Sequence, residues 1–174
     1  MLLRSICNNA TIAALSVTGT SFFALAGAYY FQFVVGLQPC VLCLYQRIPH
    51  AIEIMLGLTA LILAWKYNRP KRAAFVILLS SLVYLVSAGL GFYHAGVEQH
   101  WWISILEACS NPMITSGTKD LLSKIEKAQA VRCDAVPWQM FGISMAGYNG
   151  ILSVLMTIYT SVAAVLITRR ANGL

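Results

Sequence analysis

Residues 73–93, AAFVILLSSLVYLVSAGLGFY, decide the fold class, because they form a continuous apolar run without a charged side chain. A helix that crosses the hydrocarbon core of a bilayer needs about 20 predominantly apolar residues. Three further runs meet this requirement, at about 11–34, 43–65 and 141–168. The sequence therefore predicts an all-α integral membrane protein, a bundle of four transmembrane helices.

The composition of the whole chain agrees with a membrane protein. Of its 174 residues, 59% are hydrophobic and 10% are charged, whereas roughly a quarter are charged in an ordinary soluble domain. No linker or repeat divides the chain, so we expect residues 1–174 to form a single membrane domain. The net charge of +6 does not indicate nucleic-acid binding, because the basic residues lie in short clusters at the ends of apolar runs.

The basic clusters predict the orientation, because cytoplasmic loops are enriched in Lys and Arg. Four basic residues crowd the connection at 66–72, one precedes the first span and two follow the last: Lys66, Arg69, Lys71 and Arg72, then Arg4, then Arg169 and Arg170. We therefore expect both termini and this loop to be cytoplasmic, with the protein in the bacterial inner membrane. The loops at about 35–42 and 94–140 are then periplasmic.

The first apolar run resembles a cleaved signal sequence only at its start. After Arg4 it continues without a charge to Arg47, whereas the apolar region of a signal peptide spans about 7–15 residues. We therefore expect it to be a retained span. Small residues recur along this span and the last one, which favours close helix packing in a membrane: Ala24, Ala28, Gly147 and Gly150.

The long loop at 94–140 contains two further patterns. Trp101, Trp102 and Trp138 predict anchors at the membrane interface, where indole rings concentrate. Apolar residues recur at helical spacing after Ser116 and Thr118, which are plausible helix caps: Leu121, Leu122, Ile125 and Ala128. This pattern predicts a short amphipathic helix that lies on the membrane surface.

Four of the five cysteines fall on the predicted periplasmic side: Cys40, Cys43, Cys109 and Cys133. Disulfides are the default expectation in that oxidising compartment, whereas Cys7, near the cytoplasm, is expected to be a reduced bystander. A static Cys40–Cys43 bridge would remove little unfolded-chain entropy because its loop is very short, so the CxxC is expected to be redox-active. Static disulfides and a zinc site made by all four remain alternatives. Structural zinc sites usually pair two close-spaced motifs, so we expect no metal.

The residues around Cys43 favour its thiolate form. Cys43 lies in the first turn of the second span, where the positive end of the helix dipole stabilises an anion. Arg47 follows four residues later, on the same helical face. Two interpretations of Arg47 stay open: a side chain that snorkels to the interface, and a partner for an anion or a polarised carbonyl such as a quinone oxygen. Glu53 could pair with Arg47 or His50, relay protons, or belong to a structural ion pair.

Three segments carry a family resemblance: CVLCLYQR at 40–47, YHAGVEQHWW at 93–102, and the return to the last span from CD at 133–134 through PW at 137–138 to FGISM at 141–145. Together they resemble the DsbB family of bacterial inner-membrane disulfide-forming proteins. The resemblance covers essentially the whole chain, and a CxxC followed by Gln-Arg is a specific signal. The second span departs from the family pattern, because Pro49, His50 and Glu53 make it more polar than expected.

The resemblance implies a quinone-dependent thiol oxidase that supports disulfide formation in secreted proteins. A periplasmic DsbA-like thioredoxin-fold oxidase would be reoxidised by a Cys109–Cys133 disulfide, with Cys109 forming the mixed disulfide. Electrons would pass to Cys40 and Cys43 through a transient Cys40–Cys133 bridge, and from Cys43 to ubiquinone or menaquinone near Arg47. This family's pathway is known to keep the periplasm oxidising, and its soluble partner is a strong oxidant that needs an acceptor of still higher potential.

Three competing functions remain. A vitamin K epoxide reductase-like protein is also a quinone-coupled four-span bundle, but its CxxC lies near the last span and its loop cysteines come earlier, the reverse of the order here. A haem-binding electron-transfer subunit would use His50 and His94. A structural membrane protein would keep static disulfides that do not respond to a reduced partner.

Overall fold

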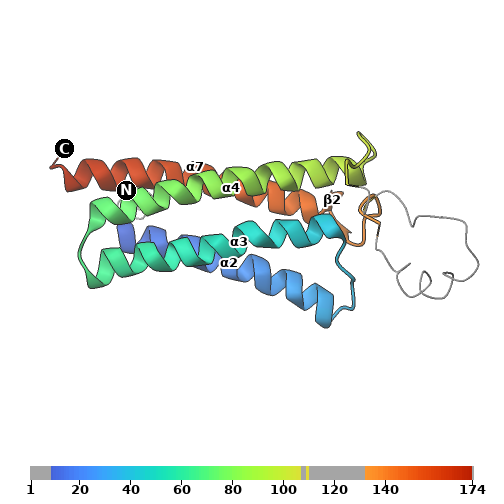
Figure 1. Cartoon of the computed structure of the whole chain (residues 1–174), viewed down its shortest axis with the longest axis horizontal. Coiled ribbons are helices and arrows are strands. Elements are labelled where there is room, and N and C mark those ends of the chain that lie inside the picture. Colours follow the sequence, from blue (N-terminus) through green and yellow to red (C-terminus); the bar gives the residue numbers. More distant parts are fainter. Residues whose placement is uncertain (1–8, 107–108, 110–131, 174) are drawn as a thin grey trace, which may run out of the picture.

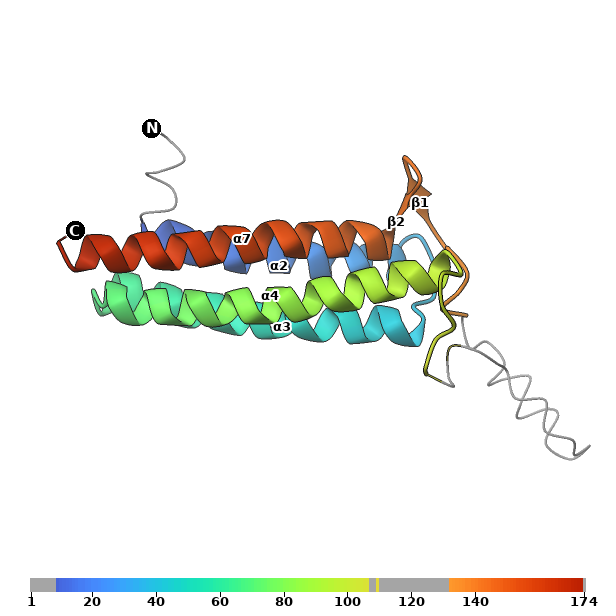
Figure 2. The same ribbon diagram turned by 90° about the horizontal axis from the view of Figure 1, so that it is seen from above.

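The structure is a computed structural model that describes residues 9–106, 109 and 132–173. Four of its helices are long and apolar enough to cross a membrane, and they form a bundle in which α2 diverges from α3 toward its C-terminal end (Figures 1 and 2). They are α2 (Ala10–Phe33), α3 (Val41–Leu61) with its π-helical continuation η1 (Ile62–Lys66), α4 (Pro70–Glu98) and α7 (Met145–Ala171). The prediction of an all-α, four-helix membrane protein is confirmed. Cys7 and the expected surface helix at 116–128 lie outside the described residues.

The start of α2 and the end of α7 lie at one end of the bundle, together with the α3–α4 connection (Figures 1 and 2). The α2–α3 connection and the segment that precedes α7 lie at the opposite end. We call this second end the cysteine end, because Cys40, Cys43, Cys109 and Cys133 all lie there. The basic residues at 66–72 and 169–170 are therefore far from the cysteines.

Helix α4 continues beyond 93, where the apolar run of the third span stops, and ends at Glu98. His94 and Glu98 are both buried on this extension, one turn apart, with 3.8 Å between His94 Nε2 and Glu98 Oε1. Beyond the helix, the Gly96 carbonyl accepts a hydrogen bond from the Trp101 amide, and His100 has a φ of 58°. A residue in this left-handed conformation is a common way to end a helix.

The fourth span begins later than the expected 141, because its first residues form a β-hairpin. Phe141 and Gly142 have φ values of 51° and 76°, and two successive positive φ values are typical of a type I′ hairpin turn. Ser144 then caps α7 by accepting a hydrogen bond from the Gly147 amide. The strands on either side of the turn pair antiparallel: β1 (Gln139–Met140) and β2 (Ile143–Ser144).

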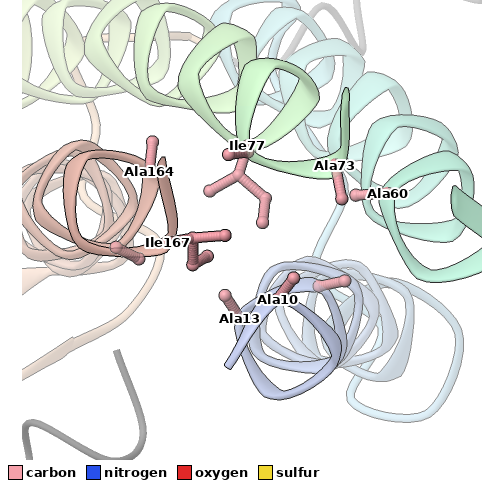
Figure 3. Close-up of a cluster of buried hydrophobic side chains, with 10 residues drawn as sticks. Ala10, Ala13, Ala60, Ala73, Ile77, Ala164 and Ile167 are labelled. Carbon is pink, nitrogen blue, oxygen red and sulfur yellow. The ribbon is translucent and has the colours of Figure 1, made fainter. Parts of the chain in front are cut away.

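Small side chains fill the bundle at the end away from the cysteines. Ile77 of α4 and Ile167 of α7 point toward each other there, and alanines from all four helices surround them (Figure 3). The labelled alanines are Ala10, Ala13, Ala60, Ala73 and Ala164. Alanine allows backbones to approach closely, which gives the dispersion contacts that associate helices in lipid.

Helices α4 and α7 pack closely at a pair of glycines. A Cβ placed on Gly91 would lie 2.6 Å from the Gly150 backbone nitrogen, a separation that real Cβ atoms do not adopt. The expectation of close packing at Gly150 therefore has a definite partner. Ala24 and Ala28, by contrast, line a pocket.

Candidate functional site

Cys40 and Cys43 form a dithiol at the start of α3. Cys40 is the N-cap residue, and its sulfur accepts a hydrogen bond from the Cys43 amide over 3.2 Å. The Cys40 thiol in turn donates to the Cys43 sulfur, with 2.9 Å between the two Sγ atoms. This donated hydrogen bond and burial both raise the pKa of Cys40 above its ordinary value, because each favours the protonated thiol. Cys40 therefore holds the proton of the pair, and Cys43 offers the accepting sulfur.

Cys109 and Cys133 form a disulfide across 24 residues of sequence. Both are buried, and they pack in one apolar cluster with Cys40, while Cys43 lies against its edge. The cluster also contains Leu42, Val97 and the partly buried Val41, Tyr93 and Leu106. The structure thus brings together the four cysteines that the sequence singled out, one pair oxidised and the other reduced.

His94 of α4 links the dithiol to the interior of the bundle. Its Nε2 lies 3.5 Å from the Cys40 sulfur, and its Nδ1 lies 2.7 Å from the amide nitrogen of Gln46. The Asn149 amide donates to the Gln46 oxygen over 2.8 Å. His94 is therefore held from one side by a sulfur and from the other by two connected amide side chains.

From Asn149 the hydrogen bonds continue toward the middle of the bundle. His50 Nε2 lies 2.7 Å from the Asn149 oxygen, and His50 Nδ1 lies 3.3 Å from the Ser21 hydroxyl. Ser21 is 2.8 Å from the Tyr84 hydroxyl, which also donates to the Val17 carbonyl. We call these side chains the polar row; they are His94, Gln46, Asn149, His50, Ser21 and Tyr84. They come from all four helices.

A pocket of about 290 Å³ opens beside the polar row and reaches Cys43. Most of its wall is apolar, from α2, α7 and the α2–α3 connection, and includes Phe23, Leu25, Phe31, Leu37 and Leu152. The polar part of the wall comes largely from α3 and α4, with Arg47, His50, His94 and Glu98, and Asn149 of α7 adds to it. Apolar cavities with a few convergent polar groups are the usual form of small-molecule sites.

Arg47 is held at the side of this pocket. Its Nη1 donates to the Gln32 side-chain oxygen over 2.6 Å, and its guanidinium lies 4.8 Å from the centre of the Tyr29 ring. These contacts use one edge and one face of the guanidinium, while Arg47 still lines the pocket. Arg47 is four residues from Cys43, so both groups lie on the pocket side of α3.

The family model of disulfide bond formation protein DsbB matches residues 10–163 of the chain. The chain belongs to the DsbB family. The disulfide bond formation protein B of Shewanella sp. (strain MR-4) is 29% identical over 159 residues, which cover 82% of each chain. A disulfide bond formation protein B 2 of Pseudomonas savastanoi pv. phaseolicola is 30% identical over 143 residues, 80% of this chain and 75% of the relative. No solved structure matches the chain significantly.

Membership of the DsbB family supports disulfide bond formation by a disulfide oxidoreductase of the membrane. Family membership disfavours the alternative of a vitamin K epoxide reductase-like protein, in which the order of the cysteines is reversed. Haem binding through the proposed pair of histidines is disfavoured by geometry as well, because both ring nitrogens of His50 are engaged, one by Asn149 and the other by Ser21. In this DsbB-family protein, the two histidines belong to one hydrogen-bonded row.

Glu53 pairs with neither Arg47 nor His50, which was one of the alternatives that the sequence left open. It is fully buried on α3, and neither carboxylate oxygen has a hydrogen-bond partner among the described residues. Arg47 is instead bound to Gln32, and His50 to Asn149 and Ser21.

Sequence reasoning missed three residues of this DsbB-family site: Gln46, Asn149 and Glu98. Each is a polar residue within or at the end of a membrane-spanning helix, and such residues usually face the bundle interior. The i, i+4 spacing of His94 and Glu98 was a usable signal, because it places both on one helical face. The contact between Gln46 and Asn149 gave no such signal, since it joins different helices.

Proposed function

We propose that this DsbB-family protein oxidises a reduced DsbA-like thioredoxin-fold partner in the periplasm and uses a membrane quinone, ubiquinone or menaquinone, as electron acceptor. The observation that carries the proposal is the packing of the disulfide and the dithiol in one cluster beside an apolar pocket that reaches Cys43. Thiol–disulfide exchange requires a sulfur to attack a neighbouring disulfide, and this cluster holds the two pairs in contact. Disulfide formation in secreted proteins would then be the result.

The first part of the proposed reaction moves two electrons from the partner to the inner pair. A partner thiolate attacks the Cys109–Cys133 disulfide at Cys109, which forms a mixed disulfide and releases Cys133 as a thiolate. Cys133 attacks an oxidised Cys40–Cys43 bond at Cys40, which releases the Cys43 thiolate. The second partner thiol displaces Cys109, and Cys109 then displaces Cys40 from Cys133. The partner is now oxidised and Cys40 and Cys43 are reduced, which matches the pattern of one disulfide and one dithiol.

The pocket fits the headgroup of a quinone. Its walls are mainly aromatic and aliphatic, and Arg47 and Cys43 lie on its polar side. Arg47 would donate hydrogen bonds to a carbonyl oxygen, and the apolar walls would exclude water from the sulfur. A quinone bound there would accept two electrons and two protons and leave the cysteines as a disulfide. Cys40, which holds its proton against Cys43, is positioned to release that proton when its sulfur forms the bond.

The orientation in the membrane belongs to the same proposal. The basic residues at 66–72 and 169–170 lie at the end opposite the cysteines (Figure 1), and basic residues favour the cytoplasmic face. We therefore place the cysteine end in the periplasm of the bacterial inner membrane. A membrane-impermeant maleimide applied to intact spheroplasts should label Cys40 or Cys43 after reduction. Labelling of these residues only after lysis would contradict this orientation.

Turnover with purified components tests the proposed function. The full chain is mixed with a reduced thioredoxin-fold oxidase and a soluble quinone analogue, and the absorbance of the quinone is followed. Serine at Cys43 or at Cys109 should each abolish quinone consumption, whereas Cys7→Ser should leave it unchanged. Quinone consumption that persists without Cys43 or Cys109 would contradict the proposed route.

The step at which each variant stops separates the two halves of the route. Cys43→Ser should still form a mixed disulfide at Cys109 with a partner that retains only its attacking thiol, because that attack precedes any use of the inner pair. Cys109→Ser should form none. Mixed disulfide formation that survives Cys109→Ser would show that the partner attacks elsewhere.

A further inference from the structure

Three potential metal ligands meet at the cysteine end. The sulfurs of Cys40 and Cys43 and the Nε2 atom of His94 all lie within 4.8 Å of one another, and Cys40 and His94 are buried. The two sulfurs are 2.9 Å apart, and His94 Nε2 is 3.5 Å from the Cys40 sulfur. Two thiols and one imidazole form a ligand set that suits zinc and similar thiophilic cations.

Glu98, one helical turn from His94, is the candidate for a fourth ligand. Its Oε1 lies 3.8 Å from His94 Nε2, and its side chain is 2% exposed. Its Oε2 is buried without a hydrogen-bond partner among the described residues. A buried carboxylate oxygen that lacks a partner costs free energy, and a bound cation would remove that cost.

The distances are close to those of tetrahedral coordination. Bonds of about 2.3 Å to sulfur and about 2.0 Å to nitrogen place a sulfur and a nitrogen ligand of zinc about 3.5 Å apart, and two sulfur ligands about 3.7 Å apart. The Cys40–His94 separation already has this value. The two sulfurs need to separate by about 1 Å, which a small rotation of either side chain provides.

We propose that the reduced form of this protein binds one thiophilic divalent cation of the zinc type through Cys40, Cys43 and His94, with Glu98 as the fourth ligand. Binding replaces the thiol protons, which leave to solvent, and involves no change of oxidation state. The disulfide form of Cys40 and Cys43 cannot bind the cation in this way, because its sulfurs are no longer thiolates. The cation therefore recognises one redox state and, while bound, withholds both sulfurs from exchange.

The polar row provides the outer shell that such a site requires. A histidine that binds a metal through Nε2 normally donates its other ring hydrogen to an oxygen acceptor. His94 Nδ1 faces the Gln46 amide at 2.7 Å, and rotation of that amide by half a turn presents its oxygen instead. Asn149 can rotate in the same sense and still bond to both Gln46 and His50. The row thus accommodates a metal-bound His94 without losing a hydrogen bond.

Cobalt(II) binding to the full-length reduced protein tests this proposal without partner or quinone. The protein is the Cys109→Ser/Cys133→Ser double variant, so that reduction exposes no other thiols in the long loop. Co²⁺ should bind one per chain, with thiolate-to-cobalt charge-transfer absorption and the intense visible bands of tetrahedral cobalt. Zn²⁺ should abolish these bands by displacement. Oxidation of Cys40 and Cys43 to the disulfide before the titration should prevent binding.

Variants assign the ligands. Adding Cys43→Ser or His94→Ala should lower the Co²⁺ affinity by at least about 100-fold, and adding Glu98→Gln or Gln46→Leu should lower it by about 10-fold. Helix content and thermal unfolding identify a variant that has misfolded. If His94→Ala or Cys43→Ser misfolds, the Co²⁺ affinity of the conservative Glu98→Gln variant tests the ligand assignment. Thr59→Val on α3, whose hydroxyl bonds within its own helix, should leave the affinity unchanged.

Three results would overturn the proposal: an octahedral cobalt spectrum, equal affinity of the dithiol and disulfide forms, or full affinity in folded His94→Ala and Glu98→Gln variants. Each leaves the proposed thiol oxidation untouched, because that function is measured by quinone consumption. Tetrahedral cobalt binding in a protein that consumes no quinone would instead support the metal site and contradict the proposed function.

Discussion

Arg47 shows how a costly residue in a membrane helix is fixed in place. Its side chain is held by Gln32 and by the face of Tyr29, both from α2, while it still lines the pocket beside Cys43. Gln32 and Tyr29 lie in the last turns of α2, so these contacts fit both a side chain that reaches the interface and the binding role that we propose.

Replacement of Arg47 by alanine should weaken use of the quinone without blocking exchange with the partner. A hydrogen bond to a charged group contributes about 1.5–3 kcal/mol, so we expect the KM for the quinone to rise by about 10-fold to 100-fold. The measurement is steady-state quinone consumption at saturating partner. Arg72→Ala, at the opposite end of the bundle, is the matched control. An unchanged KM in Arg47→Ala would remove Arg47 from the quinone site.

The hydrogen bond between Cys40 and Cys43 predicts how the alkylation of Cys40 depends on pH. The pKa of Cys40 is raised first by the hydrogen bond that it donates to Cys43, then by burial. Because the thiolate is the form that reacts, alkylation of Cys40 should require a higher pH than alkylation of an ordinary thiol. Removal of the acceptor in Cys43→Ala should lower the pKa of Cys40 and shift this profile to lower pH.

The pH profile is measured by iodoacetamide labelling of the protein with its Cys109–Cys133 disulfide intact, and mass spectrometry then identifies Cys40. The disulfide-bonded cysteines do not react and serve as internal controls. A profile that stays at the same pH, or moves upward, in Cys43→Ala would contradict the hydrogen-bond assignment.

At the scale of elements, the positions of the helices could be predicted from sequence, and α2 and α3 with η1 begin and end within two residues of the predicted bounds. Transfer of an apolar run into lipid depends on the run alone, so the four spans follow from hydropathy. The C-terminal end of α4 and the start of α7 could not be predicted. Helix α4 extends to Glu98 with His94 and Glu98 both buried on the extension, an arrangement that composition does not reveal. The β-hairpin before α7 was missed because Phe141, Ile143 and Met145 read as the start of an apolar span.

The glycine contact between α4 and α7 can be tested with two neighbouring substitutions. Gly91→Ala places a methyl group against the Gly150 backbone, whereas the same change at Gly89 meets no atom within 4 Å. Overpacking costs about 1–3 kcal/mol, so Gly91→Ala should lower the free energy of unfolding by that amount. Gly89→Ala should be neutral or slightly stabilising, because alanine favours helix by up to about 1 kcal/mol.

Unfolding of both glycine variants is followed in mixed micelles with increasing denaturing detergent. Equal stability of the Gly91→Ala and Gly89→Ala proteins would show that the helices separate easily at this point. It would then place the close approach of α4 and α7 elsewhere along their length.

At the scale of the whole molecule, the polar row connects all four helices inside an otherwise apolar bundle. Ser21 is on α2, Gln46 and His50 on α3, Tyr84 and His94 on α4, and Asn149 on α7. The cysteines of the site could be found from their spacing and compartment. The row could not, because the rotation of each helix about its axis is set by packing against the other three.

Removal of the central amide should loosen the bundle as a unit. Asn149→Leu leaves Gln46 and His50 each without one partner, and an unsatisfied buried polar group costs about 1–3 kcal/mol. We expect the free energy of unfolding to fall by that amount in the detergent titration. Thr59→Val, which removes a hydroxyl bonded only within α3, is the control and should have little effect. Equal stability of Asn149→Leu and the parent protein would show that the row adds no cohesion.

The cap of α3 has a consequence of its own. The sulfur that receives the Cys43 amide hydrogen is the same atom that must bond to another sulfur in each turn of the proposed cycle. A sulfur in a disulfide is a weaker acceptor and lies in a different direction, so we expect the first turn of α3 to be better capped when Cys40 is reduced than when it is oxidised. Oxidation would then loosen the backbone next to Cys43, one of the residues that line the pocket.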